Sequence, residues 1–267
     1  MWSRMFSTRR QSNSTEVDGA EGKIRSVDLH SHILPGIDDG SGSVSESLEM
    51  LRLMREQGVE KVVATPHFYP GQITPQKFLE RRDLAVAQLS EALEKEKAKG
   101  KRFPSICVGA EVAFFNGISR SEVISELCIK GTRLLLVEMP FESWSEDTVE
   151  ELFRIKTLQG LVPVVAHIER YLAYQNDPEL FSSIFSGEII IQSNASAFLD
   201  RKTSKRVLKM LAEGEIDLLG SDCHNLGKRA PNMSQGLAAI RKSLGDEAVE
   251  ELYTFGNYVL EEAKIIM

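Results

Sequence analysis

Short apolar segments that end in a histidine or a carboxylate recur along this chain, and they constrain its fold more than any other feature. The first, VDLHSH at residues 27–32, carries His30 and His32 two positions apart. On an extended strand such side chains project to the same face, so the two imidazoles can hold one metal ion together. The other segments are VVATPH, ICVGAEV, VPVVAH and DLLGSDCH. Together the five segments contain all five histidines of the protein, with Glu111 and Asp222.

Apolar runs alternate with helical patterns along the chain. Strands are expected at about residues 27–31, 62–65, 106–112, 134–138, 162–166, 189–191 and 218–220. Near-continuous apolar strands separated by helices indicate a parallel sheet that is buried on both faces. Every candidate ligand stands at the carboxyl end of a strand, where (β/α) barrels carry their active sites. No Gly-rich phosphate loop is present. We therefore predict an α/β fold, a single-domain TIM-like (β/α) barrel of about seven strand-then-helix units.

Local signals predict where several helices begin. Ser43 to Glu46 reads as a capping box, and Ser119 to Glu122 reads as a second one. Asp177 and Pro178 predict another start, because proline is pre-set for the first helical position.

Composition limits the remaining possibilities. With 267 residues and 42% hydrophobic content, the chain can build one large core, which we assign to residues 26–267. Residues 1–25 have no apolar signal region and are predicted to form a flexible polar tail. A net charge of -7 argues against a protein that coats nucleic acid, and no apolar run is long enough for a membrane span.

The three cysteines, Cys107, Cys128 and Cys223, form no CxxC pair and include an unmatched thiol. This usage is typical of a reducing compartment, so we expect a cytoplasmic protein.

Imidazole and carboxylate donors without thiolates suit Mn, Zn or Fe, and many ligands on one rim suit more than one ion. Glu111 and Asp222 are the natural bridges between adjacent cations. Neighbouring metals lower the pKa of a bound water to about 7 and clamp the oxygens of an in-line displacement, as in phosphatases. Arg170 and Arg229 follow ligand motifs, where a guanidinium can grip phosphate oxygens.

The motifs DLHSHILPGIDDG, ATPH, GAE, VEMPF, AHIER and SDCHN, with Arg229 and Pro231 after them, occur in order from about Val27 to the C-terminus. This ordered set resembles the polymerase-and-histidinol-phosphatase (PHP) superfamily. Within it, the set is similar to the manganese-dependent protein-tyrosine phosphatases of bacterial capsule and exopolysaccharide operons. The resemblance also implies a distorted (β/α)7 barrel.

The resemblance implies a site for three Mn²⁺ ions, with Fe or Zn as alternatives. The implied ligands are His30, His32, Asp39, His67, Glu111, His167, Asp222 and His224. One ion would be held by His30, His32, Glu111 and Asp222, a second by Glu111, His67 and His167, and a third by Asp39 and His224. Arg170, Arg229 and Asp39 are the implied catalytic residues, with the arginines on the phosphate.

The implied reaction is the hydrolysis of phosphotyrosine on the C-terminal tail of an autophosphorylated bacterial tyrosine kinase that regulates polysaccharide export. Because a phenol has a pKa of about 10, this leaving group needs less help from a general acid than an alkyl alcohol does.

Several alternatives stay open. Asp38 and Asp39 can form an Asx-turn, the two arginines can be surface ion pairs, Glu169 can orient a neighbour, and Asn194 can merely finish a turn. Cys223 to Arg229 also satisfies the C-x5-R spacing of cysteine-dependent tyrosine phosphatases. In that case Cys223 would be the nucleophile.

Two other functions fit the same pattern. A histidinol-phosphatase, or another small-molecule phosphoesterase, would use the same metals. A metal-stabilised binding module without activity would keep the barrel but tends to lose ligands.

Overall fold

The computed structural model of the protein describes residues 24–266. The predicted tail at residues 1–25 falls outside this part except for its last two residues. Among the described residues, no helix is both long and apolar enough to cross a membrane.

The strands form two sheets in which every pair is parallel. One sheet has the order β1-β2-β4 and the other β3-β5-β6-β7-β8-β9. The strands are β1 (Ser26–Ser31), β2 (Val59–Ala64), β3 (His67–Phe68), β4 (Ser105–Val108), β5 (Glu111–Ala113), β6 (Leu134–Glu138), β7 (Val162–Val165), β8 (Ile190–Asn194) and β9 (Leu218–Gly220).

The strand predicted at residues 106–112 is interrupted in the structure, and the strand predicted at residues 62–65 is followed by a short additional strand. Residues 65–66 separate β2 from β3, and residues 109–110 separate β4 from β5. The breaks lie side by side, because the backbone N–H of Gly109 donates to Ala64 at 2.9 Å and that of Glu111 donates to Pro66 at 3.0 Å. β2 with β3, and β4 with β5, therefore each fill one position in the ring of strands. The strands of the described residues occupy seven such positions.

The ring of strands closes between its first and last members. The backbone N–H of Asp222, just after β9, donates to the carbonyl of His30 at 2.8 Å, and His32 donates to Cys223 at 2.9 Å. The side chain of Asp28 adds to this seam by accepting the N–H of Ser221 at 2.8 Å. The predicted α/β class and the distorted barrel of parallel strands are confirmed.

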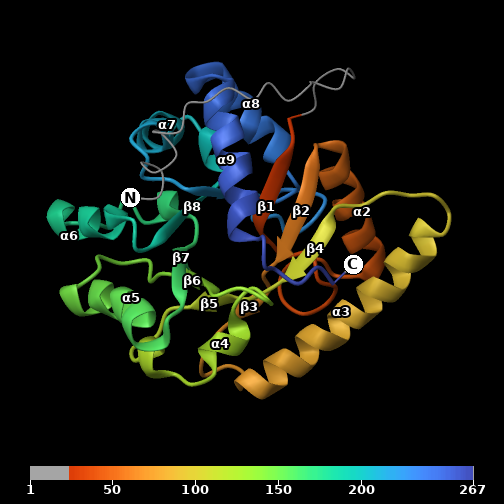
Figure 1. Cartoon of the computed structure of the whole chain (residues 1–267), viewed down its shortest axis with the longest axis horizontal. Coiled ribbons are helices and arrows are strands. Elements are labelled where there is room, and N and C mark those ends of the chain that lie inside the picture. The colour runs from red at the N-terminus through yellow and green to blue at the C-terminus, as the bar shows by residue number, and fades with distance from the viewer. Residues whose placement is uncertain (1–23, 267) are drawn as a thin grey trace.

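Helices surround the strands (Figure 1). Figure 1 shows α2 and α3 outside β1, β2 and β4, with α5 and α6 on the opposite side of the molecule. The helices are α2 (Val44–Glu56), α3 (Pro75–Lys97), α4 (Ile124–Leu127), α5 (Glu146–Gln159), α6 (Pro178–Ser183), α7 (Ser204–Ala212), α8 (Met233–Leu244) and α9 (Asp246–Val259). Short 3₁₀ helices lie at Ile118–Arg120, Ile168–Arg170, Ile184–Ser186 and Ala195–Phe198.

Two of the predicted helix starts are confirmed. The hydroxyl of Ser43 accepts the N–H of Glu46 at 3.2 Å at the start of α2. The carboxylate of Asp177 accepts two N–H groups at the start of α6. The capping box predicted at Ser119 to Glu122 is wrong. Ser119 lies inside a 3₁₀ helix, and its N–H donates to Glu151 of α5 at 3.3 Å. Ser119 therefore takes part in a tertiary contact instead of capping a helix.

The core consists of a large apolar cluster between strands and helices and a smaller one along the strands. The smaller cluster contains Leu29 of β1, Leu136 of β6 and Val164 of β7, with side chains of α9 packed against it. Close-packed strands of this kind hold their carboxyl ends in fixed positions.

Candidate metal centre

All eight predicted metal ligands come together at the carboxyl ends of the strands. They are His30, His32, Asp39, His67, Glu111, His167, Asp222 and His224. Six of them are almost completely buried, whereas His67 is 11% exposed and Asp39 is 66% exposed. The cluster therefore begins in the protein interior and reaches the surface at Asp39.

Glu111 lies at the centre of the cluster. Its Oε2 is 3.2 Å from Nε2 of His30 and 3.3 Å from Nε2 of His32. The same oxygen is 2.9 Å from Nδ1 of His67, and Oε1 is 2.9 Å from Nε2 of His167. Burial alone would raise the pKa of Glu111, but the surrounding histidines hold it well below its usual range. The group is an anionic carboxylate that faces four imidazoles, as a bridging ligand must.

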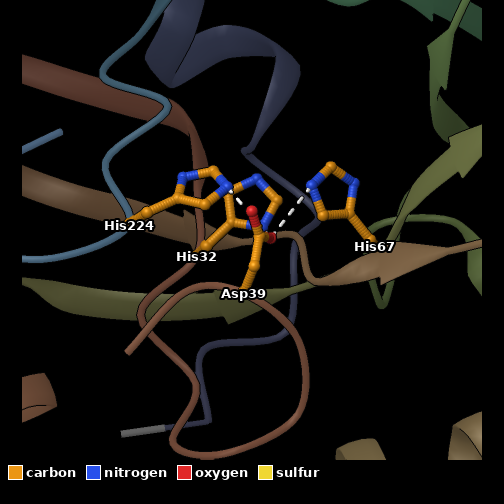
Figure 2. Close-up of side chains that lie close together, drawn as sticks. All are labelled: His32, Asp39, His67 and His224. Atoms are coloured by element: carbon orange, nitrogen blue, oxygen red, sulfur yellow. Dashed lines mark ion pairs between the residues drawn. The ribbon is translucent and has the colours of Figure 1, made fainter. Parts of the chain in front are cut away.

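A second group of donors lies at the mouth of the cluster (Figure 2). Figure 2 shows the carboxylate of Asp39 between His67 and His224, with His32 behind it. Oδ1 of Asp39 is 3.4 Å from Nε2 of His67 and 3.4 Å from Nε2 of His224. The rings of His32 and His224 are 3.8 Å apart between centroids. These four side chains can surround one cation.

Three of the histidines have their outer ring nitrogen occupied by an oxygen acceptor. Nδ1 of His30 is 3.2 Å from Gln192, Nδ1 of His32 is 2.8 Å from Asp38, and Nδ1 of His224 is 3.0 Å from a backbone carbonyl. An oxygen at this position places the proton on Nδ1 and leaves the lone pair of Nε2 for a metal. All three Nε2 atoms point into the cluster.

Unpaired polar atoms in the cluster also fit a bound cation. Although each lies close to an oppositely charged group, Oε2 of Glu111, Nδ1 of His67 and Nε2 of His224 are buried and make no well-aligned hydrogen bond among the described residues. Leaving such groups unpaired in the interior is costly, and a metal ion satisfies them. Imidazole and carboxylate donors suit Mn, Fe or Zn. The residues present therefore fit the metals that the sequence predicts.

The donor residues fall into three groups, whose members differ in part from the three predicted ligand sets. The first contains His30, His32 and Glu111, with Oδ1 of Asp222 at 3.7 and 3.5 Å from the two Nε2 atoms. The second joins His67 and Glu111 to Glu138, and the third is the group at the mouth. His67 links the last two groups, because its Nδ1 faces Glu111 and its Nε2 faces Asp39.

Glu138 is absent from the predicted ligand set. It ends β6, and its Oε1 lies 3.5 Å from Nε2 of His167. The sequence contained a signal for it, because Glu138 ends an apolar strand as the other candidates do.

Asp222 is held by three side chains besides facing the histidines. Arg170 and Asn194 donate to Oδ2, the latter at 2.9 Å, and Arg229 donates to Oδ1 at 2.7 Å. Burial raises the pKa of Asp222, but His30, His32 and Arg170 together keep it well below its usual range. Both predicted phosphate-binding arginines thus lie at this carboxylate, with about a third of each side chain exposed.

Hydrogen bonds from β8 fix the surroundings of Asp222. Gln192 accepts the backbone N–H of His167 at 2.8 Å and donates to Asn194 at 3.0 Å. The buried carboxylate of Glu169 accepts the hydroxyl of Ser193 at 2.9 Å. Glu169 therefore orients its neighbours, as one alternative predicted, whereas Asn194 does more than finish a turn.

The backbone is strained at two site residues. His167 has φ 31° and Asp222 has φ 51°, and no other non-glycine residue of the described chain has a positive φ. Such values cost free energy and persist where the surroundings enforce them.

Two glycines allow close approach to the first strand. A Cβ at Gly220 would lie 2.5 Å from Cβ of His30, and one at Gly40 would lie 2.4 Å from the carbonyl oxygen of His32. Neither position has room for a side chain.

The C-x5-R alternative fails on the structure. The side chain of Cys223 is fully buried, and burial raises the pKa of its thiol well above the usual range. In the following loop, the N–H groups of His224 and Asn225 donate to the carbonyl of Arg229, and those of Gly227 and Arg229 donate to the Asn225 side chain. A phosphate loop needs such groups directed at its ligand, so Cys223 is a core residue.

Comparison with known proteins agrees with this arrangement. The family model described as capsular polysaccharide synthesis, CpsB/CapC, matches residues 26–260. The tyrosine-protein phosphatase YwqE of Bacillus subtilis is 26% identical over 83% of this chain and 86% of its own length. The tyrosine-protein phosphatase CpsB of Streptococcus agalactiae is 28% identical over 85% of this chain and 94% of its own.

A solved structure agrees in fold. It comes from crystal structures of YwqE from Bacillus subtilis and CpsB from Streptococcus pneumoniae, described as unique metal-dependent tyrosine phosphatases. It superposes with a TM-score of 0.77 and 25% identity, covering 90% of this chain and 96% of that one.

Proposed function

The chain belongs to the CpsB/CapC family of capsular polysaccharide synthesis, and from that premise we propose that it is a metal-dependent protein-tyrosine phosphatase. The observation that carries the proposal is the position of Glu111, whose two carboxylate oxygens face four histidine rings at 2.9 to 3.3 Å. A carboxylate placed among several imidazoles is suited to bridge neighbouring cations. The relatives are named as tyrosine phosphatases.

We assign the eight predicted ligands to three metal ions, most simply Mn²⁺, with Fe or Zn as alternatives, and we add Glu138 to the second group. When bound, such ions act as Lewis acids and lower the pKa of a bound water, which supplies the nucleophile for phosphate ester hydrolysis.

The chain itself positions the phosphate. Asp222 holds Arg170 and Arg229 at the same carboxylate. A guanidinium has five N–H donors, so each arginine retains donors for phosphate oxygens while it contacts Asp222. The two guanidinium groups would then offset the negative charge that accumulates on the phosphorus-bound oxygens in the transition state.

The exposed Asp39 at the mouth is the remaining candidate catalytic group. It lies between two ligands of the third metal group, and its Oδ2 is 3.8 Å from Nη1 of Arg229. We propose that Asp39 binds an ion and orients Arg229. A tyrosine leaving group departs as a phenolate, so no buried acid is required opposite the metals.

We propose further that the substrate is the phosphorylated C-terminal tail of a bacterial tyrosine kinase that controls capsule or exopolysaccharide export, and that the enzyme acts in the cytoplasm. We assign the catalytic domain to residues 26–267.

The test is hydrolysis of a phosphotyrosine peptide by metal-stripped protein with and without added Mn²⁺. We expect turnover only with metal, and we expect Cys223→Ser to retain it because that thiol is buried in the core. Histidinol phosphate is the competing substrate. A higher kcat/KM for histidinol phosphate would overturn the tyrosine-phosphatase assignment in favour of a small-molecule phosphatase.

A further inference from the structure

We propose that Tyr69 and Phe141 form two aromatic walls that bind the phenyl ring of the substrate and make the site selective for aryl over alkyl phosphates. This inference rests on the proposed phosphatase function and adds a basis for its choice of substrate. Neither residue is a candidate metal ligand.

Each ring stacks on a different histidine of the cluster. The Tyr69 ring is stacked on His67, with centroids 5.0 Å apart and planes at 24°. The Phe141 ring is stacked on His167, with centroids 6.2 Å apart and planes at 16°. Both histidines contact the same carboxylate, since Glu111 lies 2.9 Å from each. Each aromatic ring is therefore one histidine away from the same carboxylate.

Phe141 is both exposed and firmly held. Its side chain is 47% exposed. Behind it lies the buried ring of Tyr171, 5.4 Å away between centroids, whose hydroxyl accepts the N–H of Met139 at 2.9 Å. A partly exposed ring that already packs against neighbouring aromatic rings is suited to receive another one.

The chemistry of the substrate explains the selectivity. In phosphotyrosine the phenyl ring lies between the phosphate and the peptide backbone. When the phosphate reaches the metals and arginines, the ring must lie just outside them, at the level of the histidines that Tyr69 and Phe141 cover. An alkyl phosphate has no aromatic surface at that level and gains nothing from the walls.

Binding of two phosphonates to the Mn²⁺-loaded protein tests the inference without requiring turnover. Benzylphosphonate carries an aromatic ring, and methylphosphonate does not. Calorimetry on Phe141→Leu and Tyr69→Leu should show about 3- to 10-fold weaker binding of benzylphosphonate, as expected for the loss of an aromatic pair. Methylphosphonate binding should change less than twofold, and Tyr69→Phe should restore the aryl preference.

Two controls keep the result interpretable. Leu158→Ala removes a more exposed apolar side chain on α5, 61% exposed, and should leave both affinities unchanged. Metal content, measured by mass spectrometry, should be the same in every variant. Equal losses for both phosphonates, or none for either, would overturn the aromatic walls. Wild-type protein that binds benzylphosphonate preferentially but does not hydrolyse phosphotyrosine would instead overturn the proposed function alone.

Discussion

The carboxylate of Asp38 lies 2.8 Å from Nδ1 of His32, and the same oxygen accepts the backbone N–H of His67 at 3.0 Å. One aspartate thus orients the ring of one candidate ligand and the backbone of another. Its other oxygen accepts the N–H of Gly40 at 3.0 Å in an Asx-turn. Burial alone would raise the pKa of Asp38, but the contacts with His32 and the backbone lower it to about 2.

Substitution of this aspartate should weaken metal binding without removing a ligand. In Asp38→Ala the ring of His32 loses its acceptor, so we expect a 10- to 100-fold lower Mn²⁺ affinity, as is usual for outer-shell partners of metal-bound histidines. Asp38→Asn keeps an acceptor and should lose less. Metal titration of stripped protein measures both. Asp83→Ala, at an exposed aspartate of α3 paired with Lys130, serves as the control and should bind Mn²⁺ normally.

A methyl group at Gly40 should disrupt the site. Gly40→Ala would place its Cβ 2.4 Å from the His32 carbonyl, so the backbone that carries His32 must shift. We expect at least a tenfold loss of kcat/KM, because small displacements of catalytic groups have large effects on rate. The matched control is Gly42→Ala in the same loop, whose nearest neighbour would be the Glu46 side chain at 3.6 Å. Equal kcat/KM values for the two variants would contradict this account.

Gln192 should act as a positioning residue for two ligands. Gln192→Ala removes the acceptor for Nδ1 of His30 and for the strained backbone N–H of His167. We expect the metal-free protein to lose about 1–3 kcal/mol of unfolding free energy, since buried donors are left unpaired. Chemical denaturation measures this, and Mn²⁺ titration should show a parallel drop in affinity. Gln159→Ala, which removes a contact near Ser119 away from the site, should not change Mn²⁺ affinity.

Substitution of the two arginines should impair catalysis on the phosphate group without removing the bound metal. Arg229→Ala or Arg170→Ala should lower kcat/KM for a phosphotyrosine peptide by about 10²- to 10³-fold, the usual effect of removing a donor that stabilises developing charge. Bound Mn²⁺ should remain, because a guanidinium has no lone pair to offer a metal and the carboxylate of Asp222 is still present. Arg154→Ala on α5, at an arginine that is also about a third exposed and is paired with Glu150, controls for loss of positive charge. Normal kcat/KM in both site variants would leave the arginines as structural ion pairs.

Stability should depend on pH through Asp217, which is remote from the metal ligands. Burial raises its pKa from 3.8 to about 6, although its carboxylate accepts the N–H of Ile191 at 2.9 Å. Between these values the folded state binds more protons than the unfolded state, so stability falls as pH rises from about 4 to 6. The shift corresponds to about 3 kcal/mol. In Asp217→Asn this contribution should disappear, and denaturation of metal-free protein at several pH values compares the two slopes.

Much of the site was predictable because most candidate ligands stand directly at the end of an apolar strand in the sequence. An apolar strand that ends in a histidine identifies both the strand and the rim on which the side chain lies. That reasoning placed His30, Glu111 and Asp222 in one cluster. It would also have found Glu138 had the same rule been applied to β6.

Contacts between distant segments were not predictable. Gln192 lies within β8 and Asp38 lies in a loop, and only the folded chain brings them to His30 and His32. The failed cap at Ser119 has the same cause, since Glu151 on a later helix takes its N–H.

The seam that closes the barrel joins segments that are far apart in the order of synthesis. Ser221 and Asp28 are 193 residues apart, and their hydrogen bond cannot form until nearly the whole chain has left the ribosome. A nascent chain that ends before β9 already carries His30, His32, His67 and His167 but has an open sheet edge beside β1. The complete set of donor residues therefore comes together late in folding. Long-range closure of this kind is slow compared with the formation of local helices.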